Sequence, residues 1–317
     1  MLLRDLLKSL NSIYPTVLSE KWDIQSSLQV GDPSATITKA LVALDVRDAV
    51  IDEAKQIGAN LIITHHPLIF KPLSNLISTD PISNKVIKLI KNDIALISLH
   101  TNADSVIGGL NDYLAFLIGL IDLVPLIPSN TSVNLSPQPV IGISHNTSLS
   151  IPLKDGFTCP FSDNSLQLLV FDKEKWSEIE VKEVSLNGLG RVGKLAKPVA
   201  LSSLIDSLTL VFRSKLGNKY IPKIKSTAQY DRLISTVAIC TGSGSSLISS
   251  LPNVDCFITG DVTYHTIQAA LDRDLVLVDA SHWATEVLYE EVFVERIGSL
   301  CPRIQVVQSN FSGDLFE

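Results

Sequence analysis

The spacing of apolar residues along the chain predicts strands and helices in a regular order. Buried strands are predicted where apolar runs are nearly continuous, at residues 40–46, 60–66 and 94–104, the last running into a loop. Apolar residues recur at helical spacing over 47–58, with Gly58 as C-cap, and over 78–93. This alternation predicts an α/β fold with a parallel sheet covered on both faces.

The same order of elements recurs in the C-terminal third. Strands are predicted at 234–240, 254–261 and 275–282, a Gly-rich turn and helix at 241–251, and helices at 262–274 and 283–297. Asp45 and Thr64 are 19 positions apart, as are Cys240 and Thr259, and an amphipathic helix precedes each block at 2–13 and 201–217. We infer two homologous α/β lobes produced by internal duplication. A single sheet of successive α/β units is the alternative.

The predicted domains are a first lobe over 1–120, a connecting segment over 121–185 and a second lobe over 186–317. The connecting segment begins with a stretch rich in Pro, Ser and Asn, which is typical of irregular structure. Alternating patterns at 165–176 and 178–186 indicate strands within it. No candidate chemistry falls in this segment.

Composition and charge narrow the classes of protein. The 317 residues are 45% hydrophobic and 19% charged, enough to bury a large core. The net charge of −7 argues against a broad nucleic-acid face, so we expect no direct nucleic-acid binding. No apolar run approaches the roughly 20 residues of a membrane span, and the N-terminal helical pattern predicts a docked helix, with a transit peptide as the alternative.

Four cysteines without a CxxC pair indicate buried thiols in a reducing compartment. We therefore expect a cytoplasmic protein, with a mitochondrial or nuclear pool as an alternative.

Polar side chains follow the predicted strands at the sheet edge where ligands of open α/β folds bind. The first lobe carries His65, His66, His100 and Asp104 there, and the second carries Asp261, His282 and Glu286. Both His100–Asp104 and His282–Glu286 have the four-residue spacing that places side chains on one helix face. Imidazole and carboxylate together suit zinc, iron or manganese.

Adjacent side chains on a strand diverge, so His65 and His66 would address two ions with a carboxylate between them. The alternative for each histidine is a hydrogen-bonded loop residue, and for His282–Glu286 an ion pair.

Two further features are weaker. The turn 241–246, TGSGSS, could present backbone N–H groups to an anion, although a tight strand-to-helix turn is the alternative. Basic residues in 188–197 and 213–225 could attract a phosphorylated substrate, with a solvated surface as the alternative: Arg191, Lys194, Arg213, Lys215, Lys219, Lys223 and Lys225.

The chain resembles the GTP cyclohydrolase I type 2 family, also called the NGG-one-interacting factor three family. The resemblance rests on these segments: KWDIQSSLQVGD (21–32), LIITHHPLIF (61–70), LISLHTNADSVIGGLNDYLA (96–115), NGLGRVGKL (187–195), VAICTGSGSSL (237–247), CFITGDVTYH (256–265) and DASHWATE (279–286). It departs from the family's W-D-N-x-G-L pattern at Ile24 and Ser27.

The resemblance implies two α/β lobes with a dinuclear metal site in the cleft between them. The implied ligands of two divalent ions (zinc, iron or manganese) are His65, His66, Asp104, His282 and Glu286, with Glu286 bridging. His100 is expected beside the metals as a candidate proton shuttle. The implied assembly is a homo-oligomer, a ring of six.

Two functions follow as expectations. The first is a metal-dependent hydrolase acting on a small-molecule substrate, a nucleotide or a phosphorylated metabolite. The second is a non-catalytic metal-binding adaptor that interacts with transcriptional regulators.

Overall fold

The computed structural model describes residues 1–23, 26–129, 187–216, 222–311 and 313 of the chain. The strands predicted at 165–176 and 178–186 lie outside the described residues. The chain forms two compact units, one of Met1–Val106 with Glu286–Glu317 and the other of Ile107–Thr285. These are called the first and second unit below.

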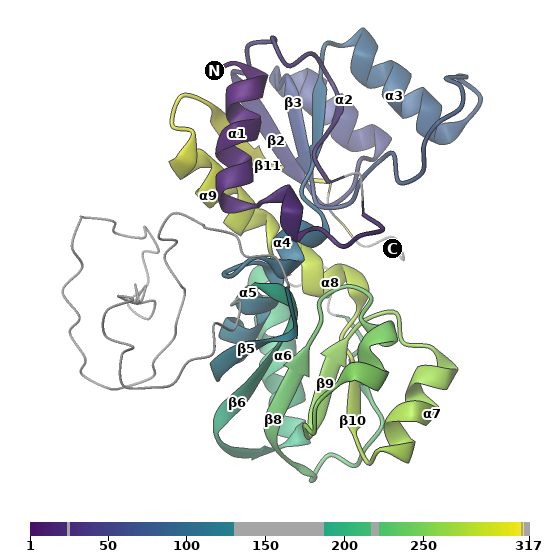
Figure 1. The fold of residues 1–317 in the computed structure, drawn as a ribbon, viewed down its shortest axis with the longest axis vertical. Helices are drawn as coiled ribbons and strands as arrows, with labels where there is room; N and C mark the ends of the chain where they lie inside the picture. The colour runs from purple at the N-terminus through teal and green to yellow at the C-terminus, as the bar shows by residue number, and fades with distance from the viewer. Residues whose placement is uncertain (24–25, 130–186, 217–221, 312, 314–317) are drawn as a thin grey trace, which may run out of the picture. The chain divides into compact units, whose positions relative to one another are not determined.

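The first unit is a parallel sheet with one antiparallel edge strand (Figure 1). Its strands are β1 (Leu28–Val30), β2 (Lys39–Ala43), β3 (Leu61–Thr64), β4 (Ala95–Ser98) and β11 (Gln305–Gln308), in the order β1-β4-β3-β2-β11. Its helices are α1 (Leu3–Ile13), a 3-10 turn at Thr16–Leu18, α2 (Asp48–Ile57), α3 (Pro81–Lys91), α4 (Thr101–Ser105) and α9 (Glu290–Leu300). Helix α8 (His282–Val287) contains the junction between the two units.

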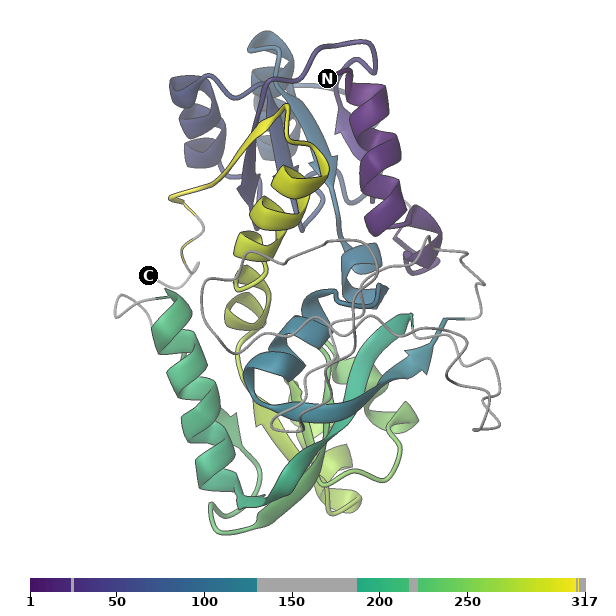
Figure 2. The same cartoon turned by 90° about the vertical axis from the view of Figure 1, so that its left-hand side faces the viewer.

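Helices cover both faces of this sheet, as the apolar pattern predicts. Leu41, Ile62 and Leu96 of the strands lie in one buried cluster with residues of α2 and α3. Helices α1 and α9 lie on the other face, where the rings of Tyr14 and Phe293 meet edge to face at 5.4 Å (Figures 1 and 2). The sheet core is therefore covered on both sides, and the central strands β3 and β4 are wholly buried.

Local sequence explains the helix ends. Gly58 has φ +68° and closes α2 in the left-handed conformation expected of a glycine C-cap. Asp80 caps α3 by accepting a hydrogen bond from the backbone N–H of Ser83, and Pro81 occupies the first turn. The buried side chains of α1 confirm that the N-terminal helix is docked on the protein.

The second unit has a sheet in the order β5-β6-β8-β9-β10-β7. The strands are β5 (Leu120–Pro128), β6 (Gly188–Ala200), β7 (Lys225–Ser226), β8 (Leu233–Ile239), β9 (Cys256–Thr259) and β10 (Val276–Asp279). The helices are α5 (Leu110–Leu117), α6 (Leu201–Leu216), the 3-10 helix η4 (Ser245–Ser250) and α7 (Tyr264–Asp272). One face carries η4 and α7, and the other carries α5 and α6, where Lys215 lies 5.8 Å from the ring centre of Tyr113 (Figure 2).

The two units repeat one order of elements and pairings. In each, a helix and a short strand precede three parallel strands, and the short strand pairs antiparallel with the third of them. Strands β2, β3 and β4 thus correspond to β8, β9 and β10, and α4 corresponds to α8. This repetition supports the two-lobe organisation inferred from equal spacing in the sequence.

The unit boundaries differ from the predicted domains 1–120, 121–185 and 186–317. Residues 107–128 form α5 and β5 and belong to the second unit, while residues from 286 onward return to the first. There β11 pairs in parallel with β2, and Glu53 accepts hydrogen bonds from the hydroxyl of Ser309 at 2.5 Å and the backbone N–H of Asn310. The edge strand with which β11 pairs, β2, is distant from it in sequence, so the order of elements along the chain did not predict this pairing.

Three local predictions also need correction. The run 94–104 ends as a strand at Ser98 and then forms α4 rather than a loop. The helix predicted at 241–251 is a 3-10 helix. The helix predicted at 283–297 is divided into α8 and α9.

The described cysteines, Cys240, Cys256 and Cys301, are buried and form no disulfide with one another. Among the described residues, no helix is both long enough and apolar enough to cross a membrane.

Candidate metal centre

The strand ends of the first unit bring its histidines together. His65 and His66 directly follow β3, and His100 follows β4 and caps α4. Because these strands are parallel neighbours, their carboxyl ends share one edge. One nitrogen from each of His65, His66 and His100 lies within 4.8 Å of the others.

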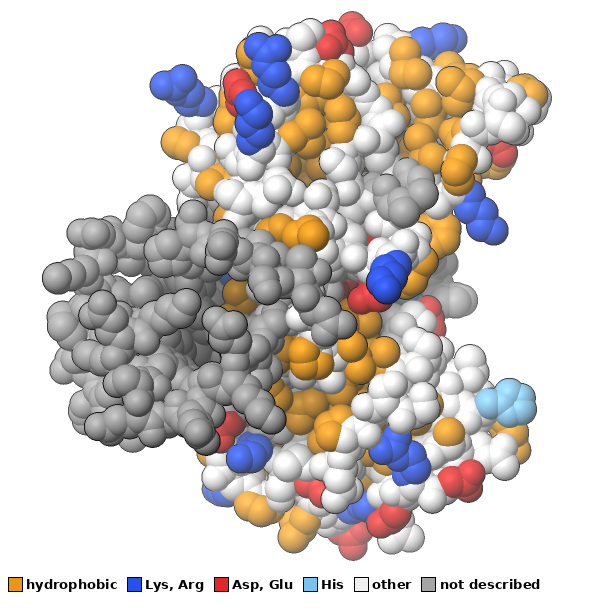
Figure 3. Space-filling model, in the orientation of Figure 1, with side chains coloured by type: hydrophobic (Ala, Val, Ile, Leu, Met, Phe, Trp, Pro, Cys, Tyr) orange, Lys and Arg blue, Asp and Glu red, His pale blue; other side chains and the backbone are white. Residues whose placement is uncertain are grey.

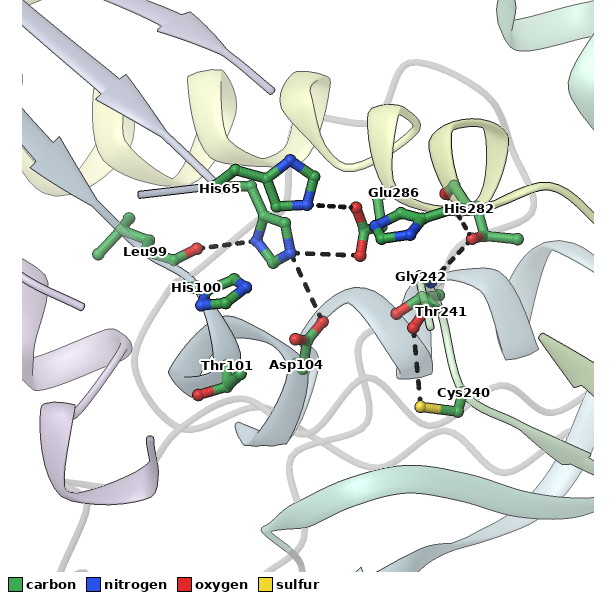
Figure 4. A network of polar contacts seen from close by, with 12 residues as sticks. His65, Leu99, His100, Thr101, Asp104, Cys240, Thr241, Gly242, His282 and Glu286 are labelled. Atoms are coloured by element: carbon green, nitrogen blue, oxygen red, sulfur yellow. Dashed lines mark hydrogen bonds and ion pairs between the residues drawn. The ribbon is translucent and has the colours of Figure 1, made fainter. Parts of the chain in front are cut away.

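His65 is buried and has a defined orientation. Its Nδ1 lies 2.9 Å from the carbonyl oxygen of Leu99, which makes Nδ1 the protonated nitrogen (Figure 4). Its Nε2 is buried without a hydrogen-bond partner and faces carboxylate oxygens of Glu286 at 3.5 Å and Asp104 at 4.0 Å. A lone pair directed toward two carboxylates across such gaps is the arrangement of a cation ligand.

His66 lies between two carboxylates. Its Nδ1 is 2.9 Å from Asp45 and its Nε2 is 2.9 Å from Glu286. Burial alone would lower the pKa of His66, but the negative charges and hydrogen bonds of Glu286 and Asp45 raise the pKa to about 10. Burial would likewise raise the pKa of Asp45, but its contact with His66 holds that pKa below its ordinary value. The pocket around His66 therefore favours positive charge.

Asp104 and Glu286 come from helices. Helix α4 places Asp104 four residues after His100, and His100 itself lies before the first turn. Glu286 lies in α8, four residues after His282, and is 5% exposed. Burying two carboxylates beside histidines is costly unless a cation balances them.

His100 is held by a buried carboxylate. Its Nδ1 lies 3.1 Å from Asp23, which also accepts hydrogen bonds from the backbone N–H and the hydroxyl of Thr101 and from the hydroxyl of Ser26. Burial would raise the pKa of Asp23, but His100, Ser26 and Thr101 hold the pKa well below its ordinary value. Asp23 therefore stays ionised and keeps Nδ1 of His100 engaged.

In the second unit, His282 has the same kind of support. Its Nδ1 lies 2.5 Å from Asp261, which follows β9 as His66 follows β3. Asp261 and Ser281 have φ of +52° and +72°, a strained conformation that a non-glycine residue keeps where the surroundings require it. A Cβ on Gly260 would overlap the backbone of His282, so only glycine fits there.

Each of these four histidines thus has its Nδ1 beside an oxygen of the protein, which leaves its Nε2 available for a ligand. This is the pattern of metal-binding histidines, whose second nitrogen is held by a carboxylate or a carbonyl. The described structure brings four of the five predicted ligands, His65, His66, Asp104 and Glu286, into one compact unit together with His100. The fifth, His282, lies in the second unit, one helical turn before Glu286 on α8. Their role as ligands stays a prediction.

Asp23 and Asp45 are site residues that the sequence analysis missed. Asp45 lies just beyond β2 at the carboxyl edge, so the rule that selected His65 could have found it. Asp23 follows no strand, and its role depends on contact with residues about 80 positions away.

The structure does not support the anion site predicted at the turn 241–246, or a role for Arg191 in attracting a substrate. Backbone N–H groups of Gly242 and Gly244 in the turn 241–246 donate to the hydroxyls of Thr285 and Thr259, so they do not face an anion. Arg191 is 1% exposed and pairs with Asp112 through two hydrogen bonds at 2.7 and 2.6 Å, so it cannot attract a substrate from solution.

Comparison with known proteins agrees with the resemblance found in the sequence. The chain is 31% identical to a protein named GTP cyclohydrolase 1 type 2 homolog from Clostridium perfringens, over 100% of this chain and 99% of that protein. It is 32% identical to a protein of the same name from Lactococcus lactis, over 81% and 76% of the two chains.

Solved structures share the fold. A Bacillus cereus protein related to NIF3 matches with a TM-score of 0.76 at 23% identity, over 100% of this chain and 99% of that one. A Staphylococcus aureus hypothetical protein matches with a TM-score of 0.74 at 25% identity, over the same shares. The model of the family Duf34/NIF3 (NGG1p interacting factor 3) matches residues 1–314. With a match over nearly its whole length, this chain belongs to the Duf34/NIF3 family.

Proposed function

We propose that the protein is a metal-dependent hydrolase of a nucleotide or a phosphorylated small molecule. Its metal ligands would be His65, His66, Asp104, His282 and Glu286, around two divalent ions. The observation that carries this proposal is Nε2 of His65, which is buried, has no hydrogen-bond partner and faces two carboxylates at 3.5 and 4.0 Å.

The donor set fits a divalent cation. A buried polar atom without a partner costs about 1–3 kcal/mol, so an Nε2 held in that state indicates a purpose other than stability. Imidazole nitrogen and carboxylate oxygen suit zinc, iron or manganese. The raised pKa of His66 points the same way, since a pocket that stabilises a proton between Asp45 and Glu286 also stabilises a metal cation.

His282 and a second ion are the finer part of the proposal. His282 and Glu286 are one turn apart on α8, so their side chains share a helix face. Glu286 uses its two carboxylate oxygens toward His65 and His66, which suits a carboxylate between two ions. We propose that His282 is the second lobe's contribution to a site in the cleft between the lobes, beside Glu286 of the first.

The remaining roles are proposed from the side-chain contacts. A divalent ion bound here would supply Lewis acidity and lower the pKa of a water toward about 7. His100 lies beside His65 and His66 and would move a proton at its Nε2. Asp23 would orient His100, because it stays ionised and contacts Nδ1. Homo-oligomer assembly and a cytoplasmic location stay predictions.

The test measures metal content and turnover separately. Purified protein is stripped with a chelator, reloaded with zinc, manganese or iron, and assayed for metal stoichiometry and for hydrolysis of a nucleotide panel. The His65→Ala and Glu286→Gln variants should lose metal and turnover. The His265→Ala variant is the matched control, because His265 is an exposed histidine of α7.

The outcomes separate the two functions. Hydrolysis by wild type that disappears in His65→Ala and persists in His265→Ala supports the proposal. Stoichiometric metal without turnover would favour the non-catalytic adaptor. Equal metal uptake by His65→Ala and wild type would refute the metal site itself.

A further inference from the structure

Two large aromatic side chains stand exposed beside the metal centre of the first unit. Trp22 is 58% exposed and Phe70 is 51% exposed. Their ring centres are 6.0 Å apart and the ring planes are tilted by 53°. Trp22 also meets the ring of His100 edge to face, with centres 5.7 Å apart. The two rings are called the aromatic pair below. One of them, Trp22, is separated from His65 and His66 by the imidazole of His100.

The backbone holds both rings in place although the rings themselves face solvent. Trp22 precedes the buried Asp23, which is bonded to Thr101, and Glu20 on its other side donates its N–H to the hydroxyl of the same threonine. Phe70 follows Ile69, whose N–H and carbonyl are both bonded to the side-chain amide of Gln29. Two loops are therefore clamped so that one presents Trp22 next to His100 and the other presents Phe70 next to Trp22.

Burial does not explain this arrangement. Exposing a Trp and a Phe forgoes the stabilisation that their burial in the core would give. Other exposed apolar residues lie in α3 and the loop before it, including Leu76, Ile77 and Ile82. Hydrophobic side chains also appear elsewhere on the face drawn in Figure 3. The aromatic pair differs from them because Trp22, one of its two rings, contacts a histidine of the proposed site.

We propose that the aromatic pair binds a planar heteroaromatic ring of the size of a nucleobase. Tilted rings offer such a ligand one face for stacking and one edge for a perpendicular contact, both favoured geometries of aromatic groups. Stacking on Trp tolerates different bases, because every base has a flat π-face. The proposal rests on the proposed function and narrows its substrate class to molecules with a nucleobase-like ring.

The alternative occupant is an apolar side chain of a second copy of this protein. Contact with His100 favours the small ring, because a ring held there would reach the histidine that the proposed function uses for proton transfer. An interface between two copies of the protein would not require the ring to touch His100. The experiment therefore measures the oligomeric state together with ligand binding.

The experiment compares two probes that differ in the base. Binding of GMP and of ribose 5-phosphate to the zinc-loaded protein is measured by calorimetry for wild type, Trp22→Leu and Phe70→Leu. Leucine keeps an apolar side chain and removes the π-face. Tyr230→Leu is the control, since Tyr230 is an exposed aromatic residue of the second unit, 62% exposed. Zinc content and molar mass are recorded for each sample.

We expect wild type to prefer GMP over ribose 5-phosphate, and each leucine variant to weaken GMP binding about 5- to 150-fold. Ribose 5-phosphate binding, zinc content and molar mass should not change, and Tyr230→Leu should match wild type. Equal GMP affinity in wild type and both variants would overturn the aromatic pair as a ring site. Equal affinity of wild type for GMP and ribose 5-phosphate would also overturn it. If wild type does not bind GMP, then AMP, CMP and UMP are tested, and the absence of binding to all four nucleotides would overturn it as well. A variant with changed molar mass and unchanged GMP binding would overturn it in favour of a contact between two copies. If the wild-type protein does not retain zinc, the result would instead contradict the proposed metal site on which this proposal rests.

Discussion

Proton release on metal binding at His66 can be worked out from the site. His66 lies between Asp45 and Glu286 at 2.9 Å from each, and these charges raise its pKa to about 10 against the effect of burial. A histidine must be neutral to bind a metal, so the proton must leave. At pH 7, competition from a proton bound with a pKa of about 10 weakens the apparent metal affinity about 1,000-fold, which is about 4 kcal/mol.

The apparent zinc affinity should therefore rise about tenfold per pH unit from about pH 6.5 to 8.5. A histidine of ordinary pKa, about 6.5, would give almost no slope above neutral pH. Competition with a chelator measures the affinity, and calorimetry in two buffers of different ionisation enthalpy counts the protons released. Asp45→Asn removes one of the charges that raise the pKa of His66, so it should flatten the slope. A zinc affinity that is independent of pH above neutral would refute this reasoning.

The same pKa sets the sign of a stability effect. The folded-state pKa of His66 lies above the ordinary value of 6.5, so its protonation stabilises the folded protein. That contribution is complete below about pH 6.5 and is lost as the pH rises through about 10. Urea unfolding of chelator-treated protein should show a falling midpoint between about pH 7 and 9.5. A midpoint that rises over this range would contradict the placement of His66 between two carboxylates.

Two further predictions concern the second unit. Arg191→Met should lower the free energy of unfolding by about 3–5 kcal/mol, because it leaves Asp112 buried without its cation. Urea unfolding measures this, and adding Asp112→Leu should recover much of the loss; a single variant as stable as wild type would contradict the burial of the pair. Gly260→Ala should lower zinc affinity about 10- to 100-fold by displacing His282. Gly298→Ala, where a Cβ meets nothing, is its control, and equal affinities in both variants would rule out this packing argument.

Sequence patterns predicted the elements well where one face of the chain is consistently apolar. Strands β2, β3, β8 and β9 and helices α2, α3 and α6 lie where periodicity places them, because their burial follows from local spacing. Periodicity did not predict the end of β4 at Ser98 or the break between α8 and α9. Tertiary contacts of the polar side chains decide where these elements end. The pattern of apolar residues in a short stretch of sequence does not contain that information.

The candidate site divides in the same way. The sequence by itself predicted that His65, His66, His100, Asp104 and Glu286 lie at or just beyond the carboxyl ends of strands, because parallel strands end at one edge. Only the tertiary structure decided how they are oriented. The contacts of Nδ1 with Leu99, Asp45, Asp23 and Asp261 join residues 21 to 77 positions apart and leave each Nε2 available for a ligand.

The largest decision left to the tertiary structure is the partner of the C-terminal segment. The sequence placed it in the second lobe, next to the elements that precede it. In the structure, β11 pairs with β2, and Glu286 joins the histidines of the first unit. Strand pairing and charge pairing depend on which groups meet in space, and amino-acid spacing encodes that only within one element. The sequence thus determined which side chains could bind a metal, and the fold determined which of them meet.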